Sequence, residues 1–281
     1  LSFNPDKIIF IDYPGFNMRI AKWSKKYKFK TIYYIAPQLW AWNEKRIKEI
    51  KKYINSLYVI LPFEKEFFES KHNYPVKFLG HPLADSIYNF KINYKSSNQL
   101  ITDDKKPIIA ILPGSRKQEI KKILNIVLET VEYFSEYQFI VAGAPNIELS
   151  YYTSIIKNKK IKVIENKTYE LLSVSYAAIV TSGTATLETA LFKVPQIVCY
   201  KSSYFSFFIA KLLVNIKYIS LVNLIMDQEI IKELIQGDCN KEKITNELRK
   251  ILNSNNRKVL KVKYDELASI LGENGTSKRV A

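Results

Sequence analysis

Asp12 is a candidate for acid–base chemistry. It directly follows an apolar, strand-like run at residues 7–11 and is separated by one tyrosine from a Pro-Gly pair. A carboxylate at a strand end, beside a tight turn, is placed to accept a proton from a substrate hydroxyl. The alternative is that Asp12 only caps the following helix or turn, which is a common use of aspartate.

The segment 112–116, Leu-Pro-Gly-Ser-Arg, has the composition of a phosphate-binding loop. It joins a strand-like run to a helix predicted to begin near Lys117. Gly114 lets the backbone approach a ligand, Ser115 offers a hydroxyl and an N–H group, and Arg116 supplies a fork-shaped cation at the helix start. An ordinary helix cap with a surface arginine would have the same sequence, so both interpretations stay open.

A second loop of this kind follows the apolar run 177–180. Ser182, Gly183 and Thr184 lead into a helix whose free N–H groups would suit a diphosphate. Glu188 comes about one helical turn after Thr184, where its carboxylate could accept both hydroxyls of a ribose. A strand–turn–helix with a Ser/Thr cap is the alternative. Two such loops in one predicted domain favour a nucleotide diphosphate as ligand.

Three further residues are candidates for the same cleft. His81 follows another strand-like run, where a cleft role and a structural hydrogen bond are equally compatible with its position. Trp42 follows a predicted strand, where aromatic residues often line pockets. Asn223 is an amide among apolar neighbours, so it either joins a core network or points into the site. Neither the histidines nor the two cysteines have the spacing of a metal site, and we expect no metal or other cofactor.

Apolar runs alternate with amphipathic stretches along the chain, which predicts an α/β protein with repeated βα units and parallel sheets. From Asp227 onward the pattern is helical and highly charged. Ligands of such folds bind outside the carboxyl ends of the strands, where the loops above lie. The strands are expected at 7–11, 31–35, 56–60, 76–79, 107–112, 137–142, 161–164, 177–180 and 196–198.

The polar, aperiodic stretch between residues 88 and 106 predicts a domain boundary, and a length of 281 residues fits two domains. We expect a first Rossmann-like domain at 1–92, a linker at 93–106, a second Rossmann-like domain at 107–252, and a C-terminal helix and tail at 253–281.

The chain carries 43 Lys and Arg against 27 Asp and Glu, a net charge of +16. Such a field favours anionic partners, namely nucleic acid, an acidic membrane surface or phosphorylated substrates, although an AT-rich genome would also enrich lysine. The Phe-rich segment 204–216 is too short to span a bilayer. It either packs in the core or lies in a membrane interface, where it could hold acyl chains.

Seven segments, in this order and at fitting distances, resemble the lipid-A-disaccharide synthases, which are inverting glycosyltransferases of GT-B type. The resemblance covers essentially the whole chain and implies two Rossmann-like domains facing a cleft. It implies that UDP-2,3-diacylglucosamine and 2,3-diacylglucosamine 1-phosphate are joined into a β-1,6-linked disaccharide, with release of UDP and without a metal. The segments are 11–17, 35–42, 61–64, 80–85, 112–116, 182–188 and 220–224.

The resemblance also implies roles and partners. Asp12 matches the family's candidate general base, and Asn223 matches another polar site residue. The nucleotide and phosphate contacts fall on Ser115, Arg116, Ser182, Gly183, Thr184 and Glu188. The implied partners are the two lipid substrates and the anionic inner-membrane surface, not nucleic acid. The implied location is the cytoplasmic face of that membrane, and the implied assembly is a homodimer.

The resemblance is incomplete at the N-terminus. The family begins with βα units that have no counterpart here, which at ~30 residues per unit is roughly 80–90 residues. We therefore expect a first domain that is truncated, in a fragment of a longer protein or in one with impaired catalysis. Gly15 stands where relatives often carry a second acid, which weakens a two-carboxylate mechanism. The alternative functions are a UDP-GlcNAc epimerase, another UDP-sugar transferase of this fold, or an impaired UDP-binding fragment.

Overall fold

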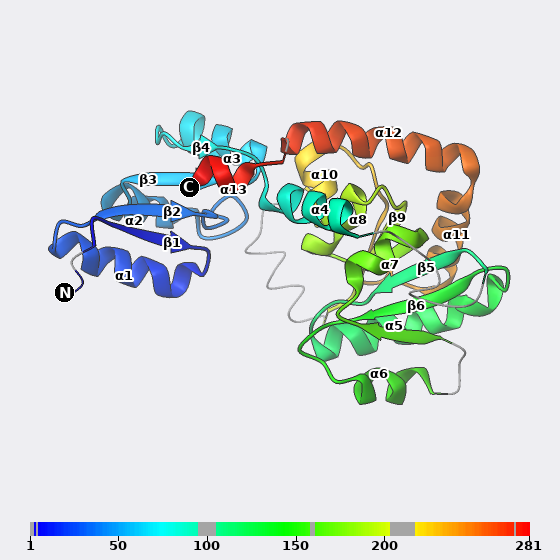
Figure 1. The fold of residues 1–281 in the computed structure, drawn as a ribbon. Coiled ribbons are helices and arrows are strands. Elements are labelled where there is room, and N and C mark those ends of the chain that lie inside the picture. Colours follow the sequence, from blue (N-terminus) through cyan, green and yellow to red (C-terminus); the bar gives the residue numbers. More distant parts are fainter. Residues whose placement is uncertain (1–2, 4, 95–104, 158–160, 203–216, 273) are drawn as a thin grey trace. The chain divides into compact units, whose positions relative to one another are not determined.

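The structure is a computed structural model that describes residues 3, 5–94, 105–157, 161–202, 217–272 and 274–281. The chain forms two compact units (Figure 1). The first contains the described residues up to Asp85 together with Ser269–Ala281, and the second contains the described residues from Ser86 to Ala268. Most of the linker expected at 93–106 lies outside the described residues, as does the Phe-rich segment 204–216.

In the described part of the chain, the first unit has a parallel sheet of four strands in the order β1-β2-β3-β4. Side chains of a strand alternate between its two faces, and the buried positions of β2 are accordingly Thr31 and Tyr33. Tyr33 packs with Phe10 and Leu57 in the core of this unit. The elements are β1 (Lys7–Ile11), α1 (Pro14–Lys26), β2 (Lys30–Tyr34), η1 (Glu44–Arg46), α2 (Ile47–Tyr53), β3 (Ser56–Val59), α3 (Pro62–Glu66), η2 (Phe67–Lys71) and β4 (Lys77–Phe78).

The second unit has a parallel sheet whose described strands follow the order β10-β9-β8-β5-β6-β7. The chain leaves the central pair β5 and β8 toward opposite edges, through β6 and β7 on one side and β9 and β10 on the other. The loops after β5 and β8 therefore lie at the topological switch point, where open α/β sheets bind their ligands. The strands are β5 (Ile108–Leu112), β6 (Gln138–Gly143), β7 (Lys162–Glu165), β8 (Ser175–Thr181), β9 (Gln196–Tyr200) and β10 (Glu233–Ile235).

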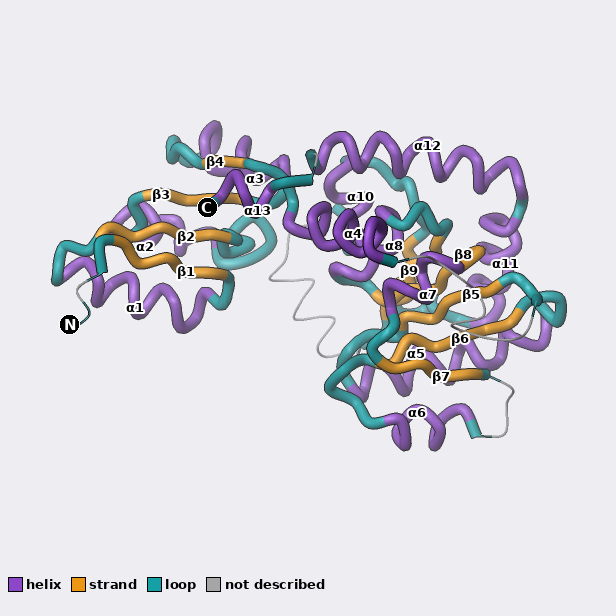
Figure 2. The backbone as a smooth tube through the Cα atoms, viewed as in Figure 1, coloured by secondary structure: helices purple, strands orange, loops and turns teal. Residues whose placement is uncertain are grey.

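Helices cover both faces of this second sheet (Figure 2). One face packs on α5 (Lys117–Thr130), α6 (Leu149–Ile156) and α11 (Lys241–Leu252). The other packs on α7 (Thr168–Val174) and α8 (Thr184–Leu191), and α10 (Leu221–Met226) contacts α8. Every residue of β5 is buried, because alternate side chains enter the core on each face. A strand covered on both sides reads as an uninterrupted apolar run, which is the pattern seen in the sequence.

The prediction of an α/β fold with parallel sheets is confirmed. The prediction that the chain is helical from Asp227 onward is wrong at one element, because Glu233–Ile235 form the edge strand β10. Three residues are too few to show the period of two by which a strand is recognised in a sequence. The long helices in this part are α11 and α12 (Ser254–Leu271), and the short helix α13 (Thr276–Val280) follows them.

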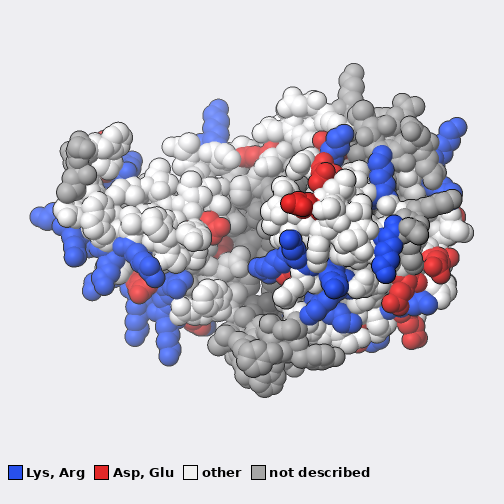
Figure 3. Space-filling model, turned by 90° about the horizontal axis from the view of Figure 1, so that it is seen from below, with Lys and Arg blue, Asp and Glu red and all other residues white. Residues whose placement is uncertain are grey.

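The surface is basic, as the net charge of +16 requires. Figure 3 shows Lys and Arg side chains gathered on the visible face of the first unit. One source is α1, whose last turn contains Lys25 and Lys26 and whose first turn has no acidic residue. In the part of the chain that the structure describes, no helix is long and apolar enough to cross a bilayer.

The C-terminal residues are held in the first unit by the turn between β4 and α4 (Pro82–Asn93) and by Asp85 in the first turn of α4. The Asp85 carboxylate accepts hydrogen bonds from the backbone N–H groups of Gly275, Thr276 and Ser277, at 2.5, 3.0 and 2.7 Å. Gly80 has a φ of +109°, and a Cβ there would lie 2.5 Å from the Thr276 hydroxyl oxygen. The turn therefore requires glycine both for its backbone conformation and for close approach of the C-terminal segment.

Replacing Asp85 with Asn is expected to lower the melting temperature by roughly 2–6 °C, because charge-assisted hydrogen bonds to three N–H groups are weakened. Burial alone would raise the pKa of Asp85, but these donors outweigh it and lower the pKa. The carboxylate thus stabilises the fold above its unfolded pKa of about 3.9, and this contribution is lost as the pH falls through the lower folded value. Thermal scans should show the two proteins converging at acidic pH. The exposed Asp6 provides the control Asp6→Asn, and equal effects of both changes would contradict this role of Asp85.

Candidate active site

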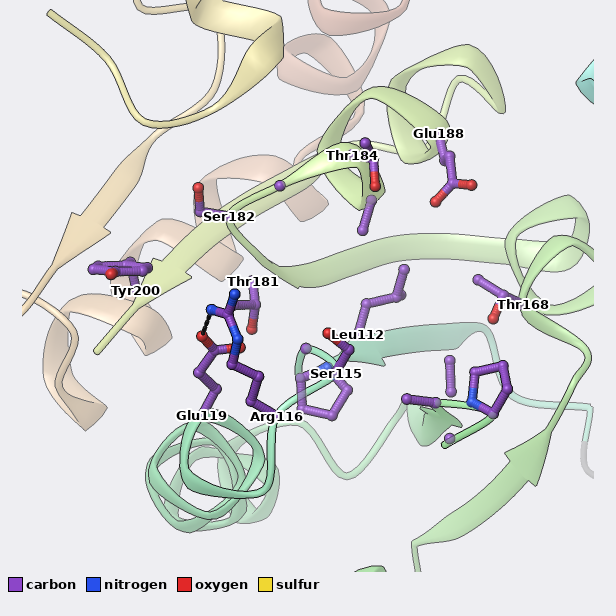
Figure 4. Close-up of a pocket in the computed structure, with 18 residues that line it drawn as sticks. Leu112, Ser115, Arg116, Glu119, Thr168, Thr181, Ser182, Thr184, Glu188 and Tyr200 are labelled. Carbon is purple, nitrogen blue, oxygen red and sulfur yellow. Dashed lines mark hydrogen bonds and ion pairs between the residues drawn. The ribbon is translucent and has the colours of Figure 1, made fainter. Parts of the chain in front are cut away.

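A cavity of about 480 Å³ opens at the carboxyl ends of β5 and β8 in the second unit (Figure 4). The loop after β5 and the loop after β8 form opposite walls, and both predicted phosphate loops therefore line one cavity. Cavities of this size at a switch point are typical small-molecule sites. The lining residues are Leu112, Pro113, Gly114, Ser115, Arg116, Glu119, Ala142, Gly143, Ala144, Pro145, Thr168, Thr181, Ser182, Gly183, Thr184, Ala185, Glu188 and Tyr200.

The loop after β5 presents a guanidinium at the start of α5. Gly114 has a φ of +101°, which bends the chain sharply before Ser115. The Arg116 side chain is 81% exposed, and its Nη1 donates a hydrogen bond to Glu119 Oε1 at 2.7 Å. This hydrogen bond raises the pKa of Arg116 further, so the guanidinium stays charged. Because the Arg116 side chain is exposed, its guanidinium can turn from Glu119 toward an anion in the cavity.

The loop after β8 presents the N-terminus of α8. Gly183 adopts φ +135° and ψ −162°, a conformation that residues with a Cβ essentially never adopt. Because a Cβ at Gly183 would meet nothing within 4 Å, backbone conformation and not space requires the glycine. Ser182 is anchored through its hydroxyl, which donates to the Ile219 carbonyl at 2.8 Å. The partial positive charge of the helix start thereby faces the cavity.

Glu188 lies at the end of the cavity nearest α7 (Figure 4). Its Oε1 accepts a hydrogen bond from the Tyr169 hydroxyl at 2.9 Å. Burial raises the pKa of Glu188, and the Tyr169 hydrogen bond partly offsets this. The second carboxylate oxygen is available to a ligand hydroxyl, which fits the role that the sequence predicts.

Asn223 is not directed into the cavity. Its side-chain amide is fully buried and donates to the Ile231 carbonyl and to Glu233, at 2.8 and 2.9 Å. Its oxygen accepts from the backbone N–H groups of Ile230 and Ile231. The amide is saturated, so the interpretation of Asn223 as a cleft residue is replaced by that of a core network residue.

Glu233 was missed by the sequence analysis, and it joins this network to the site. Its carboxylate accepts from the N–H groups of Ile219 and Ser220, from the Ser220 hydroxyl and from Asn223, at 2.7–3.0 Å. Since Ile219 in turn accepts from Ser182, the network fixes the loop after β8. No short-range pattern signals this, because Glu233 lies on the edge strand that was also missed.

His81 and Trp42 lie in the first unit and do not line the cavity. His81 is 3% exposed, its Nδ1 accepts from the Leu83 N–H at 3.1 Å, and burial lowers its pKa to about 4. The backbone N–H of His81 donates to the Leu271 carbonyl, so His81 belongs to the turn that binds the C-terminal segment. The Trp42 ring is half exposed and lies 5.6 Å from the Arg46 guanidinium.

Asp12 lies at the carboxyl end of β1, in the first unit, with an exposed side chain. Its φ is +48°, an uncommon left-handed conformation. The backbone is held there by two donors to the Asp12 carbonyl, Asn17 Nδ2 at 2.7 Å and the Tyr33 hydroxyl at 2.6 Å. A fixed backbone and a free carboxylate are the arrangement that a general base requires.

Glu119 and Thr181 line the cavity without having been predicted. Glu119 could have been found from its position three residues after Arg116 on a helix, where the two side chains meet. Thr181 carries no such signal, because it lies between the predicted strand 177–180 and the loop residues that were singled out, and the structure makes it the last residue of β8. Among the described residues, no cluster of His, Cys, Asp and Glu could hold a metal ion.

Comparison with known proteins identifies close sequence relatives. Residues 1–279 match a family model described as lipid-A-disaccharide synthetase. A lipid-A-disaccharide synthase of Coxiella burnetii is 39% identical over 256 residues, which cover 90% of this chain and 68% of the relative. One of Persephonella marina is 37% identical, covering 98% of this chain and 76% of the relative.

Solved structures with the same fold include a UDP co-structure of S. aureus MnaA and a Neisseria meningitidis UDP-GlcNAc 2-epimerase bound to UDP-GlcNAc. Their TM-scores are 0.70 and 0.67, each at 14% identity, and they cover 99% of this chain and 75% and 76% of their own. At this identity the likeness concerns the fold alone.

Proposed function

We propose, from the premise that the chain belongs to the lipid-A-disaccharide synthetase family, that its second unit binds the UDP part of the donor in the cavity between β5 and β8. The chain is a glycosyltransferase of lipid A biosynthesis, which joins UDP-2,3-diacylglucosamine to 2,3-diacylglucosamine 1-phosphate and releases UDP. One observation carries the proposed binding site: both phosphate-type loops and Glu188 line a single cavity.

The proposed donor site uses three kinds of group. The diphosphate lies against the N-terminus of α8 and is met by the Arg116 guanidinium, which is exposed enough to reach it. Ser115, Ser182 and Thr184 offer hydroxyl or N–H donors to the same oxygens. Glu188 accepts the ribose hydroxyls, and its hydrogen bond from Tyr169 fixes the carboxylate for that purpose.

Asp12 is the proposed general base. Its carboxylate takes the proton of the acceptor's 6-hydroxyl while that oxygen attacks the anomeric carbon from the face opposite the diphosphate. The bond from the anomeric carbon to the diphosphate oxygen breaks, its electron pair leaves with UDP, and the configuration inverts. Arg116 and the α8 N-terminus stabilise the charge that develops on the leaving group.

The proposal extends to the location of the enzyme. Both substrates carry acyl chains, and the net charge of +16 supports attraction to the anionic cytoplasmic face of the inner membrane. A homodimer remains an expectation of the family resemblance.

The test is an assay of UDP release with the purified protein. UDP should form only when the acylated donor and the acceptor are both present, and calorimetry should show UDP bound at one site per chain. Omission of the acceptor is the control for donor hydrolysis. Turnover of UDP-GlcNAc as fast as that of the acylated donor, or epimerisation of UDP-GlcNAc, would contradict the assignment.

A further inference from the structure

The cavity has a carboxylate at each of its two ends. Figure 4 shows Glu188 and Thr168 at one end and Glu119 and Tyr200 at the other, with Ser115 and Thr184 between them. The sheet order explains this arrangement, because Thr168 follows the edge strand β7 whereas Tyr200 ends β9, on the far side of the central pair. A ligand that spans the cavity therefore meets a carboxylate at each end.

A carboxylate at the second end needs a ligand with hydrogen-bond donors. The Glu119 side chain is only 19% exposed, and an ionised carboxylate can only accept hydrogen bonds. A diphosphate has no donor to offer and repels the charge. In the structure the Arg116 guanidinium balances the charge of Glu119. A bound diphosphate would compete with Glu119 for that guanidinium.

Thr181 is a neighbour of Glu119 in the cavity wall and carries a hydroxyl that is not bonded to it. The residue is 5% exposed, and its Oγ1 has no hydrogen-bond partner among the described residues. Thr181 and Glu119 flank the same point, since a Cβ built on Gly114 would lie 3.1 Å from Glu119 Oε2 and 3.5 Å from Thr181 Cγ2. A buried hydroxyl without a partner is destabilising, so the stability of the free protein does not explain it.

We propose that Glu119 binds the sugar ring of the donor by accepting a hydrogen bond from a free ring hydroxyl, and that Thr181 is the positioning residue for Glu119. The inference rests on the proposed function: with ribose at Glu188 and diphosphate at the central loops, the sugar reaches the Glu119 end. UDP-2,3-diacylglucosamine has free hydroxyls at positions 4 and 6. When Arg116 turns to the diphosphate, the Thr181 hydroxyl donates to Glu119 and keeps its carboxylate aimed at the sugar.

The experiment compares the affinity for UDP with the kinetics of the donor in Glu119→Gln and Thr181→Val. Glu119→Gln should lower kcat/KM for the donor about 10- to 100-fold, the range for a hydrogen bond to a charged group, with the affinity for UDP changed less than about threefold. A 4-deoxy or 6-deoxy donor should lose a similar factor with the wild-type enzyme, and Glu119→Gln should add nothing for that analogue. The deoxy donors keep the test decisive if the variant fails to fold.

Thr181→Val separates a binding role from a structural one. Valine removes only the hydroxyl that has no partner, so the melting temperature should stay equal or rise while kcat/KM for the donor falls about 5-fold. The matched control is Thr189→Val, because Thr189 is also buried, donates its hydroxyl to the Ala185 carbonyl in its own helix and is not among the residues that line the cavity. That control should leave the donor kinetics unchanged.

Three results would overturn the inference in distinguishable ways. Equal loss of UDP and donor affinity in Glu119→Gln would show that Glu119 acts only on the diphosphate through Arg116, which leaves the proposed function intact. Failure of the wild-type protein to bind UDP would instead remove the proposed function itself. Full activity of the wild type on both deoxy donors would also overturn the sugar contact.

Discussion

Asp12→Asn is expected to lower kcat by about 10²- to 10⁴-fold, the usual contribution of a positioned general base. Asparagine keeps the size of the side chain and tolerates the left-handed backbone at φ +48°. The bonds from Asn17 and Tyr33 reach the backbone carbonyl of residue 12, so they survive the change. Release of UDP under saturating donor and acceptor measures the effect.

Two controls accompany this variant. Its melting temperature should match that of the wild type, and its affinity for UDP should be unchanged because the cavity lies in the second unit. Turnover within a factor of about two of the wild type would show that another group takes the proton, since a lost base costs far more.

Arg116→Ala is expected to lower kcat/KM for the donor about 10²- to 10³-fold, comparable to removal of one donor that stabilises a developing oxyanion. The affinity for UDP should fall as well, because the diphosphate is present in both ligands. Arg116→Lys should recover only part of the loss, since an ammonium cannot form two parallel hydrogen bonds. Steady-state kinetics and calorimetry measure the two effects.

The matched control for Arg116 is its neighbour. Lys117→Ala removes the same charge one residue later, but Lys117 does not line the cavity and its ammonium lies 5.6 Å from the Tyr151 ring. An equal loss in both variants would show that the general electrostatic field, and not a contact of Arg116, attracts the donor.

The sequence was sufficient for the parts of the fold that depend on local pattern. The uninterrupted apolar run of β5 and the Gly-Ser and Ser-Gly loops that end β5 and β8 were all visible. The shared cavity was expected because the carboxyl ends of parallel strands meet at one edge of a sheet.

The rest depends on contacts that are distant in sequence. Asn223 has the composition expected of a site residue, yet its partners Ile231 and Glu233 bury it in a network. His81 belongs to a turn that contacts Leu271, about 190 residues further along the chain. Its structural role therefore could not be derived from the neighbouring sequence. Thr181 shows the opposite case, in which a residue that the sequence did not single out carries a hydroxyl with no hydrogen-bond partner among the described residues.

The turn at Gly80 and Asp85 has a consequence for how the protein is made. Its partners, Leu271 and Gly275–Ser277, lie about 190 residues further along the chain, so the ribosome adds them after the described residues of the second unit. The first unit therefore keeps these hydrogen-bonding groups without their partners until the second unit has been synthesised, and only then can its C-terminal contacts form. During that interval the first unit is exposed to chaperones and proteases.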